Sequence, residues 1–231
     1  MIVTLVRSRL AAAAVLALAA ALPTQAATIN WTTGPTFNGA NGHQGILTNG
    51  TLVEAVNLRG NPGAAIVVDP TGLNISFTTV NSPFFGVNFA GAGGGGNSDA
   101  GWATILGTFE WANGSNVSAP SFLSGLNIGT QYQVQFFAAR TDCCTTRTHW
   151  YGDGNGNLST AVAGGSYTSI VGSFTADAAT QWIQVFDSTR NPILNAYVLR
   201  DLTVAVPEPG TYALMLVGLA AVAGVSRRRR G

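Results

Sequence analysis

The sequence predicts an all-β fold, an antiparallel β-sandwich with jelly-roll-like topology, for most of the chain. Short runs rich in Val, Ile, Phe, Tyr and Trp alternate with clusters of Gly, Asn, Asp and Pro, and no run has helical periodicity. The apolar content is high enough to bury a core. The expected strands are Ile29–Thr33, Thr51–Leu58, Ala64–Val68, Leu73–Val80, Phe85–Phe89, Ile105–Trp111, Thr130–Ala139, Ser166–Phe174, Gln181–Phe186 and Leu194–Val204.

The clearest of these strands is Thr130–Ala139, where apolar and polar residues alternate. Tyr132, Val134 and Phe136 fall on one side and the intervening glutamines on the other, which predicts one buried and one solvent-facing side. The segment Leu126–Val134 also resembles the loop-to-strand corner of fibronectin type III and many carbohydrate-binding sandwiches, in which the tyrosine hydroxyl bonds to upstream backbone. An ectodomain of about 180 residues favours one large sandwich over a single module of about 100 residues.

Residues 1–26 have the three parts of a secretory signal peptide. Two arginines precede the unbroken apolar stretch Leu10–Leu22, and small residues follow up to Ala27. The apolar stretch is short for a permanent membrane span. We therefore expect cleavage after Ala26 or Ala27, which leaves an ectodomain over residues 27–205.

The charge of the ectodomain differs from that of the whole chain. Between the two ends lie five arginines, no lysine and nine carboxylate side chains, so the ectodomain has a net charge of −4 although the whole chain is at +1. A mildly acidic, lysine-free surface argues against nucleic acid or anionic lipid as a partner. Charged residues make up only 9% of the chain, so its solubility depends on Asn, Thr, Ser and Gln.

The C-terminal segment, residues 206–231, contains three elements in a fixed order. The prolines of the motif 206–210 end any structure arriving from the domain and keep the segment extended. The apolar residues 211–225 would span roughly 22 Å as a helix, short of the ~30 Å hydrocarbon core. The arginines that follow stay cytoplasmic by the positive-inside rule, which places the ectodomain outside. The predicted processing residues are Val206, Pro207, Glu208 and Pro209, and the predicted stop signal is Arg227, Arg228, Arg229 and Arg230.

This order of Pro-Glu-Pro motif, apolar segment and arginine cluster resembles the PEP-CTERM sorting domain of Gram-negative bacteria. The resemblance implies recognition by an exosortase, a membrane-embedded enzyme similar to cysteine transpeptidases, with cleavage near the motif. It also implies the export machinery as a partner, a transient single-pass form in the inner membrane and association with exopolysaccharide. The alternative is an ordinary single-pass anchor. We expect a non-enzymatic cell-surface or extracellular-matrix protein that requires no cofactor.

The densest polar stretch, between Arg140 and Asn157, reads as one long loop that could contact a ligand. Trp150 and Tyr151 could stack on sugar rings, while Arg147 and Asp153 could bond to sugar hydroxyls. This pattern makes a carbohydrate-binding, lectin-like module the main alternative function. The other interpretation is that both aromatic side chains cap the sandwich core.

The same stretch offers candidate ligands for calcium. Asp153, Asn155 and Asn157 have the one-three-five spacing of oxygen ligands at the head of a calcium loop. The pattern then fails, because Leu158 stands where the turn glycine belongs and Gly164 where the bidentate glutamate belongs. A Gly/Asn-rich turn is the better interpretation, so we expect no metal site.

The two cysteines, Cys143 and Cys144, are adjacent in a chain expected to enter an oxidising compartment. Adjacent Cα atoms lie about 3.8 Å apart, closer than the usual disulfide span of about 4.4 to 6.8 Å. The pair could therefore form a strained vicinal disulfide, stay free, or bridge to another molecule.

A glycan-active hydrolase is the enzymatic alternative. Glu54 and Glu110 could act as its two acids if strands that are distant in sequence bring them together. The sequence contains neither a Gly-X-Ser-X-Gly nor a His-Glu-X-X-His motif, and its two histidines, His43 and His149, have no partner that spacing identifies. We therefore rank the hydrolase below the carbohydrate-binding module.

Overall fold

The computed structural model describes residues 26–37, 45–58, 65–80, 88–89, 99–112, 114–140 and 144–203. The predicted signal peptide up to residue 25, the sorting tail, His43 and Cys143 lie outside these residues. The elements are β1 (Asn30–Thr36), β2 (Thr51–Leu58), β3 (Ala65–Val68), β4 (Asn74–Val80), β5 (Asn88–Phe89), α1 (Ala100–Leu106), β6 (Phe109–Trp111), β7 (Ser121–Ser124), β8 (Gln131–Phe137), β9 (Thr148–Gly152), β10 (Val162–Ala163), η2 (Gly164–Ser166), β11 (Thr168–Thr175), β12 (Thr180–Asp187), β13 (Ile193–Leu194) and β14 (Ala196–Asp201). Among the described residues, no helix is long and apolar enough to cross a membrane.

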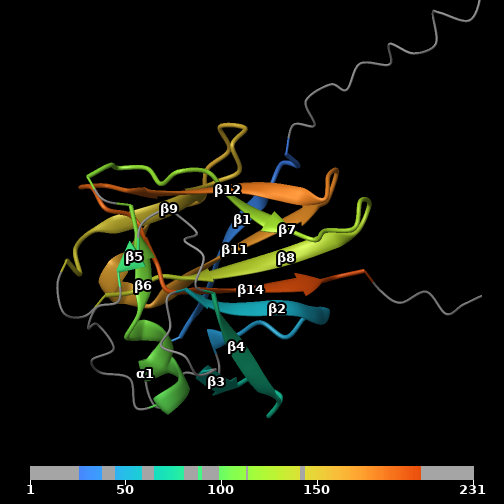
Figure 1. Ribbon diagram of the computed structural model, residues 1–231, viewed down its shortest axis with the longest axis horizontal. Coiled ribbons are helices and arrows are strands. Elements are labelled where there is room, and N and C mark those ends of the chain that lie inside the picture. The colour runs from blue at the N-terminus through green and yellow to red at the C-terminus, as the bar shows by residue number, and fades with distance from the viewer. Residues whose placement is uncertain are drawn as a thin grey trace, which may run out of the picture.

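The strands form a large and a small sheet that face each other, which confirms the predicted all-β sandwich. The large sheet has the order β1-β11-β8-β14-β2-β4-β3, and the small sheet has the order β10-β9-β12-β7. A third, three-stranded sheet has the order β13-β6-β5. Neighbouring strands of the large sheet are antiparallel except β2 and β4, which are parallel. Figure 1 shows β9, β12 and β7 as one layer over β1, β11 and β8, with β4 and β3 at the far edge of the large sheet and α1 beside them.

Two hydrophobic cores lie on the two faces of the large sheet. The first fills the space between the sheets and includes Val134 and Phe136 of β8 with Tyr151 of β9. The second lies on the other face, where Phe137 meets Trp102 of α1 with ring centroids 5.0 Å apart. Because successive residues of a strand point to opposite faces, β8 contributes to both cores.

The predicted solvent-facing side of β8 is wrong at Gln135, which is only 2% exposed. Its Nε2 group donates to the Gly45 carbonyl at 2.6 Å and to Ser169 Oγ at 2.9 Å, and its Oε1 accepts from the Leu47 N–H at 3.0 Å. The chain near Gly45 covers this part of the sheet. The side-chain amide of Gln135 can be buried there because both its nitrogen and its oxygen have hydrogen-bond partners.

The predicted corner at the start of β8 is confirmed. The Asn127 N–H donates to the Tyr132 hydroxyl at 3.0 Å, and the Tyr132 ring stacks on Phe174 with centroids 5.8 Å apart. The hydroxyl therefore binds backbone upstream of the strand, as in the sandwiches that the segment resembles.

Two predictions of secondary structure are wrong. The expected strand Ile105–Trp111 begins only at Phe109, because α1 ends with the buried side chains of Ile105 and Leu106. Asp99 caps this helix by accepting the Trp102 N–H at 2.9 Å. The expected long loop after Arg140 contains the strand β9, and β7 was not expected at all.

Candidate functional site

β9 and the turn after it carry most of the residues that the sequence singles out. β9 pairs antiparallel with β12, and this register places Trp150 opposite Phe186, Tyr151 opposite Val185 and Gly152 opposite Gln184. The alternation along β9 turns Tyr151 inward and Trp150 outward. Two adjacent aromatic residues therefore have different environments.

Tyr151 is part of the core between the sheets. Its side chain is 0% exposed, and its ring stacks on Phe136 with centroids 4.7 Å apart and planes 11° apart. Trp31 packs against it at 6.2 Å. Burial raises the pKa of the Tyr151 hydroxyl well above its ordinary value. Tyr151 offers no surface to a ligand in this structure, as the core-capping interpretation expects.

Asp153, Asn155 and Asn157 hold the start of the described chain. The fully buried Asp153 accepts the Ile29 N–H at 3.0 Å, the Asn155 N–H at 2.9 Å and the Asn157 Nδ2–H at 3.2 Å. The Asn155 amide donates to the Ala26 carbonyl, and the Asn157 amide donates to the Ile29 carbonyl. We call these three residues the N-terminal clamp. Among the described residues, no group of three or more acidic, His or Cys side chains is placed to bind a metal.

Arg147 lies before β9 and lines a small pocket rather than joining Trp150. The pocket holds about 10 Å³, room for roughly one water molecule, and its lining includes Arg140, Cys144, His149 and Asp187. The Arg147 guanidinium donates to the Arg190 carbonyl at 3.0 Å.

His149 and Cys144 are the two potentially reactive side chains of this pocket. Burial lowers the pKa of His149 to about 4, so the imidazole is neutral at ordinary pH. Its Nε2 atom is buried and has no hydrogen-bond partner among the described residues. Cys144 forms no disulfide with another described residue. Because Cys143 lies outside the described residues, the state of the cysteine pair stays a prediction.

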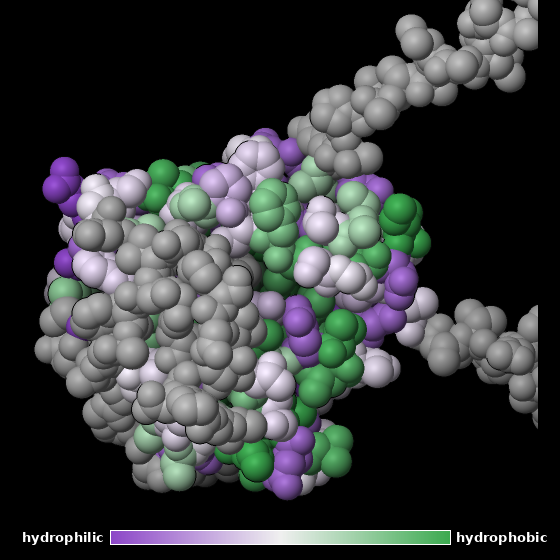
Figure 2. All heavy atoms as spheres, viewed as in Figure 1, coloured by the Kyte–Doolittle hydropathy of each residue, from purple (hydrophilic) through white to green (hydrophobic). Residues whose placement is uncertain are grey.

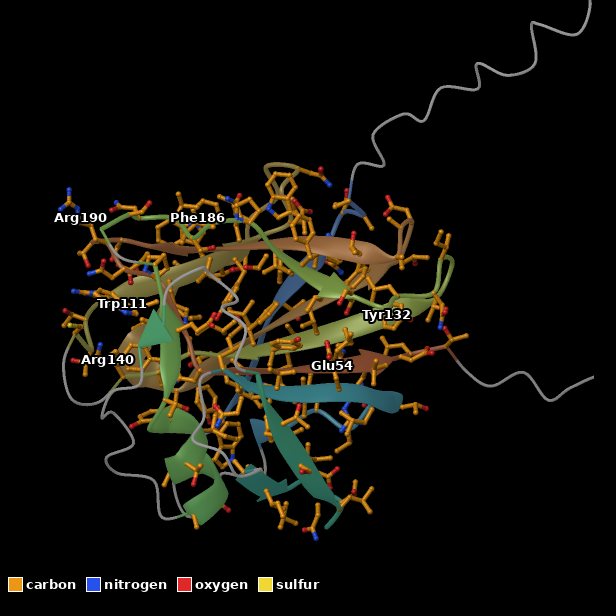
Figure 3. The ribbon with its side chains drawn as sticks, viewed as in Figure 1. Glu54, Trp111, Tyr132, Arg140, Phe186 and Arg190 are labelled. Atoms are coloured by element: carbon orange, nitrogen blue, oxygen red, sulfur yellow. The ribbon has the colours of Figure 1, made fainter. Side chains whose placement is uncertain are left out.

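The outer side of the small sheet carries four aromatic side chains, which we call the aromatic face: Phe122, Trp150, Trp182 and Phe186. Trp150 and Phe186 lie on neighbouring strands with centroids 5.9 Å apart and planes 5° apart. Trp182 and Phe122 lie opposite each other on β12 and β7, with centroids 6.3 Å apart and planes 46° apart. Phe122 is 54% exposed, and the other three are half-buried. Figure 3 shows Phe186 in the layer of β12, away from the large sheet.

Two glycines shape the surroundings of this face. A Cβ at Gly152 would lie 2.9 Å from Leu158 Cδ2 and 3.0 Å from Phe186 Cε2, so the backbone there leaves room for both side chains. Gly154 has a φ of +80°, and a Cβ there would lie 2.7 Å from Trp182 Cδ2. The turn of the N-terminal clamp thus packs directly against the ring of Trp182.

Sequence reasoning found one of these four residues, Trp150, and missed the other three. Trp182 and Phe186 alternate with Ile183 and Val185, so both sides of β12 are apolar in sequence. A strand with two apolar sides can itself indicate a binding surface. In a sheet with one open face, only one side of the strand can face the core, so the apolar residues of the other side lie at the surface. Figure 2 shows green hydrophobic side chains lying among polar ones on the face in view.

The structure does not bring the two glutamates together. Glu54 of β2 is half-buried and accepts the Tyr197 hydroxyl at 3.0 Å, while Glu110 of β6 is fully buried. Burial raises the pKa of Glu54 despite that hydrogen bond, which acts to lower it. In Figure 3, Glu54 lies toward one end of the molecule, and Trp111, the neighbour of Glu110 on β6, lies toward the other.

Fold and site together define a β-sandwich protein with an aromatic outer face. Residues 205–230 match the family model of the PEP-CTERM protein-sorting motif. The C-terminal segment is therefore a PEP-CTERM sorting motif, which implies sorting by an exosortase-type enzyme to the cell surface or the extracellular space. No curated protein and no solved structure matches the chain.

Proposed function

We propose that this protein is a non-enzymatic component of an extracellular polysaccharide matrix. It is exported with its signal peptide, held in the inner membrane by the apolar segment of its tail, and processed at Val206–Pro209 by an exosortase-like enzyme. The sorting motif at residues 205–230 is the observation that carries this proposal.

The position of the last strand, β14, supports processing next to a folded domain. β14 lies between β8 and β2 inside the large sheet, and the chain stays bonded to the sheet just beyond it. The Leu202 N–H donates to the Gln131 carbonyl at 2.7 Å, and Thr203 Oγ1 accepts the Gln131 N–H at 3.3 Å. Only three residues separate Thr203 from Pro207. The processing enzyme would therefore act next to the surface of a folded domain.

Intact mass measurement of the protein from cells and from medium tests the proposal. We expect a cell-associated form that retains Arg227–Arg230 and a released form that lacks them, with an N-terminus after residue 26 or 27. Changing Glu208 to Ala should make the longer form accumulate in membranes. A released form that still contains the four arginines would refute processing.

A second candidate function, carbohydrate binding, is supported by the aromatic face. Of the four residues expected to contact a sugar, Trp150 alone lies on this face, because Tyr151 and Asp153 are buried and Arg147 lines the separate pocket. A glycan-active hydrolase has less support, since Glu54 and Glu110 are held apart. Release of reducing sugar that disappears in Glu54→Gln would favour it instead.

A further inference from the structure

The aromatic face combines one exposed and three half-buried rings with outward positions that carry no ionisable side chain. The outward positions are Thr180, Trp182, Gln184 and Phe186 on β12, Thr148, Trp150 and Gly152 on β9, and Phe122 and Ser124 on β7. None of these side chains ionises. A solvent-facing side of a sheet is ordinarily polar, so a contiguous set of aromatic side chains there indicates a binding surface.

The neutrality of the face selects among partners. The outward positions of the face carry no cationic side chain, and the ectodomain as a whole has a formal net charge of −4 with four of its nine carboxylates buried. An anionic polymer therefore gains no electrostatic attraction from the face. An uncharged sugar chain needs no such attraction. Its ring C–H groups can lie on aromatic rings while its hydroxyls bond to amide and hydroxyl side chains.

The spacing of the rings indicates a polymer rather than a single sugar. Trp182 and Phe186 are four residues apart on β12, which corresponds to roughly 13 Å along the strand. Each has an aromatic neighbour across the strand, so the face contains two aromatic pairs with Gln184 between them. One pyranose ring cannot reach both pairs, but an extended chain lying along β12 can.

We propose that the aromatic face binds an uncharged, extended polysaccharide that runs along β12. Trp150 with Phe186 and Phe122 with Trp182 form two stacking positions. Between them Gln184, whose Nε2 donates to the Ser118 carbonyl at 3.3 Å, bonds to hydroxyls through its Oε1 and its second amide hydrogen. The turn of the N-terminal clamp supports Trp182 from the side through Gly154. This inference rests on the proposed function, because it specifies the polysaccharide that would hold the protein in the matrix.

Co-sedimentation and affinity electrophoresis of the full-length protein in detergent test the inference. The probes are cellulose and a soluble neutral glucan, with alginate as the anionic comparison. We expect binding to the neutral glucans that persists at about 1 M NaCl, where the Debye length is only about 3 Å. Replacing both Trp150 and Phe186 by Ala should weaken binding about tenfold, as should replacing Phe122 and Trp182.

The control variant is Ile66→Ala, because Ile66 is 53% exposed on β3, far from the small sheet. It should bind as the unchanged protein does, and circular dichroism with thermal unfolding checks that every variant is folded. Binding to alginate that the aromatic variants abolish, without binding to the neutral glucans, would overturn the inferred substrate class and leave the matrix function standing. Self-association that the same aromatic variants abolish, without glucan binding, would make the face a contact between copies. In both cases the processing proposal is judged separately, by the mass of the released form.

Discussion

Acid should destabilise this sandwich through His149. Burial lowers the pKa of this side chain from 6.5 to about 4 in the folded protein, whereas the unfolded chain keeps the ordinary value. Below about pH 6.5 the unfolded state therefore binds a proton that the folded state does not, and stability falls until the pH reaches the folded pKa. Each pH unit across this window is worth about 1.4 kcal/mol, so the loss at about pH 4 is about 3 kcal/mol.

The variant His149→Gln isolates this contribution, because glutamine stays neutral at every pH. Other groups also titrate in this range, and Glu54 acts in the opposite direction since burial raises its pKa. The charged groups that line the pocket beside His149 are Arg140, Arg147 and Asp187. They are unchanged in the variant and cancel in the comparison.

Urea unfolding at about pH 7 and about pH 4 measures the free energy of unfolding of both proteins. We expect the unchanged protein to lose about 3 kcal/mol more than His149→Gln between the two pH values. Equal losses in the two proteins would show that the imidazole is protonated in the folded state, and the reasoning from burial would be refuted.

Two further substitutions test contacts inside the domain. Asp153→Asn should lower the free energy of unfolding by roughly 2 to 3 kcal/mol. The Asp153 carboxylate accepts three hydrogen bonds, and the NH2 group of an asparagine in its place would face some of these donors without an acceptor. The exposed Asp177→Asn is its control, and equal urea midpoints for the two variants would contradict the role of the N-terminal clamp. Tyr132→Phe should cost about 1 kcal/mol, because it removes the acceptor of the Asn127 N–H. An unchanged thermal midpoint would show that this hydrogen bond contributes no net stability.

The parts of the fold that sequence reasoning predicted correctly depend on local patterns. The alternation of β8 and the corner at Tyr132 are both contained within a few consecutive residues. A period of two and a tyrosine after a Gly-containing turn are recognisable without knowledge of any partner strand. The sorting tail is recognisable for the same reason, since its three elements are contiguous.

The errors arose where a distant segment decides the environment of a residue. Gln135 is polar in sequence but is buried by the chain at Gly45 and Leu47, about 90 residues away. The helix α1 forms where Trp102 can enter the second core, and that core is built from strands far along the chain. Tertiary packing overrides a weak local preference in both cases.

The candidate site gives the clearest example of a difference that local sequence cannot predict. Trp150 and Tyr151 are adjacent and equally aromatic in sequence, so composition favours them equally as ligand contacts. The register between β9 and β12 decides that Trp150 faces outward beside Phe186 and that Tyr151 stacks on Phe136 in the core. A shift of one residue would exchange their roles, because the side-chain period of a strand is two.

The sequence alone therefore determined the sorting motif of this protein, its all-β class and its net charge. Each of these properties is either a total over all residues or a pattern within a contiguous segment, so none depends on which strands pair. The tertiary structure alone decided that Asp153 and its two asparagine neighbours hold the N-terminal segment, and that Phe122, Trp150, Trp182 and Phe186 form one surface. These residues come from strands that are distant along the chain, and only the hydrogen-bonded register of the small sheet places them side by side.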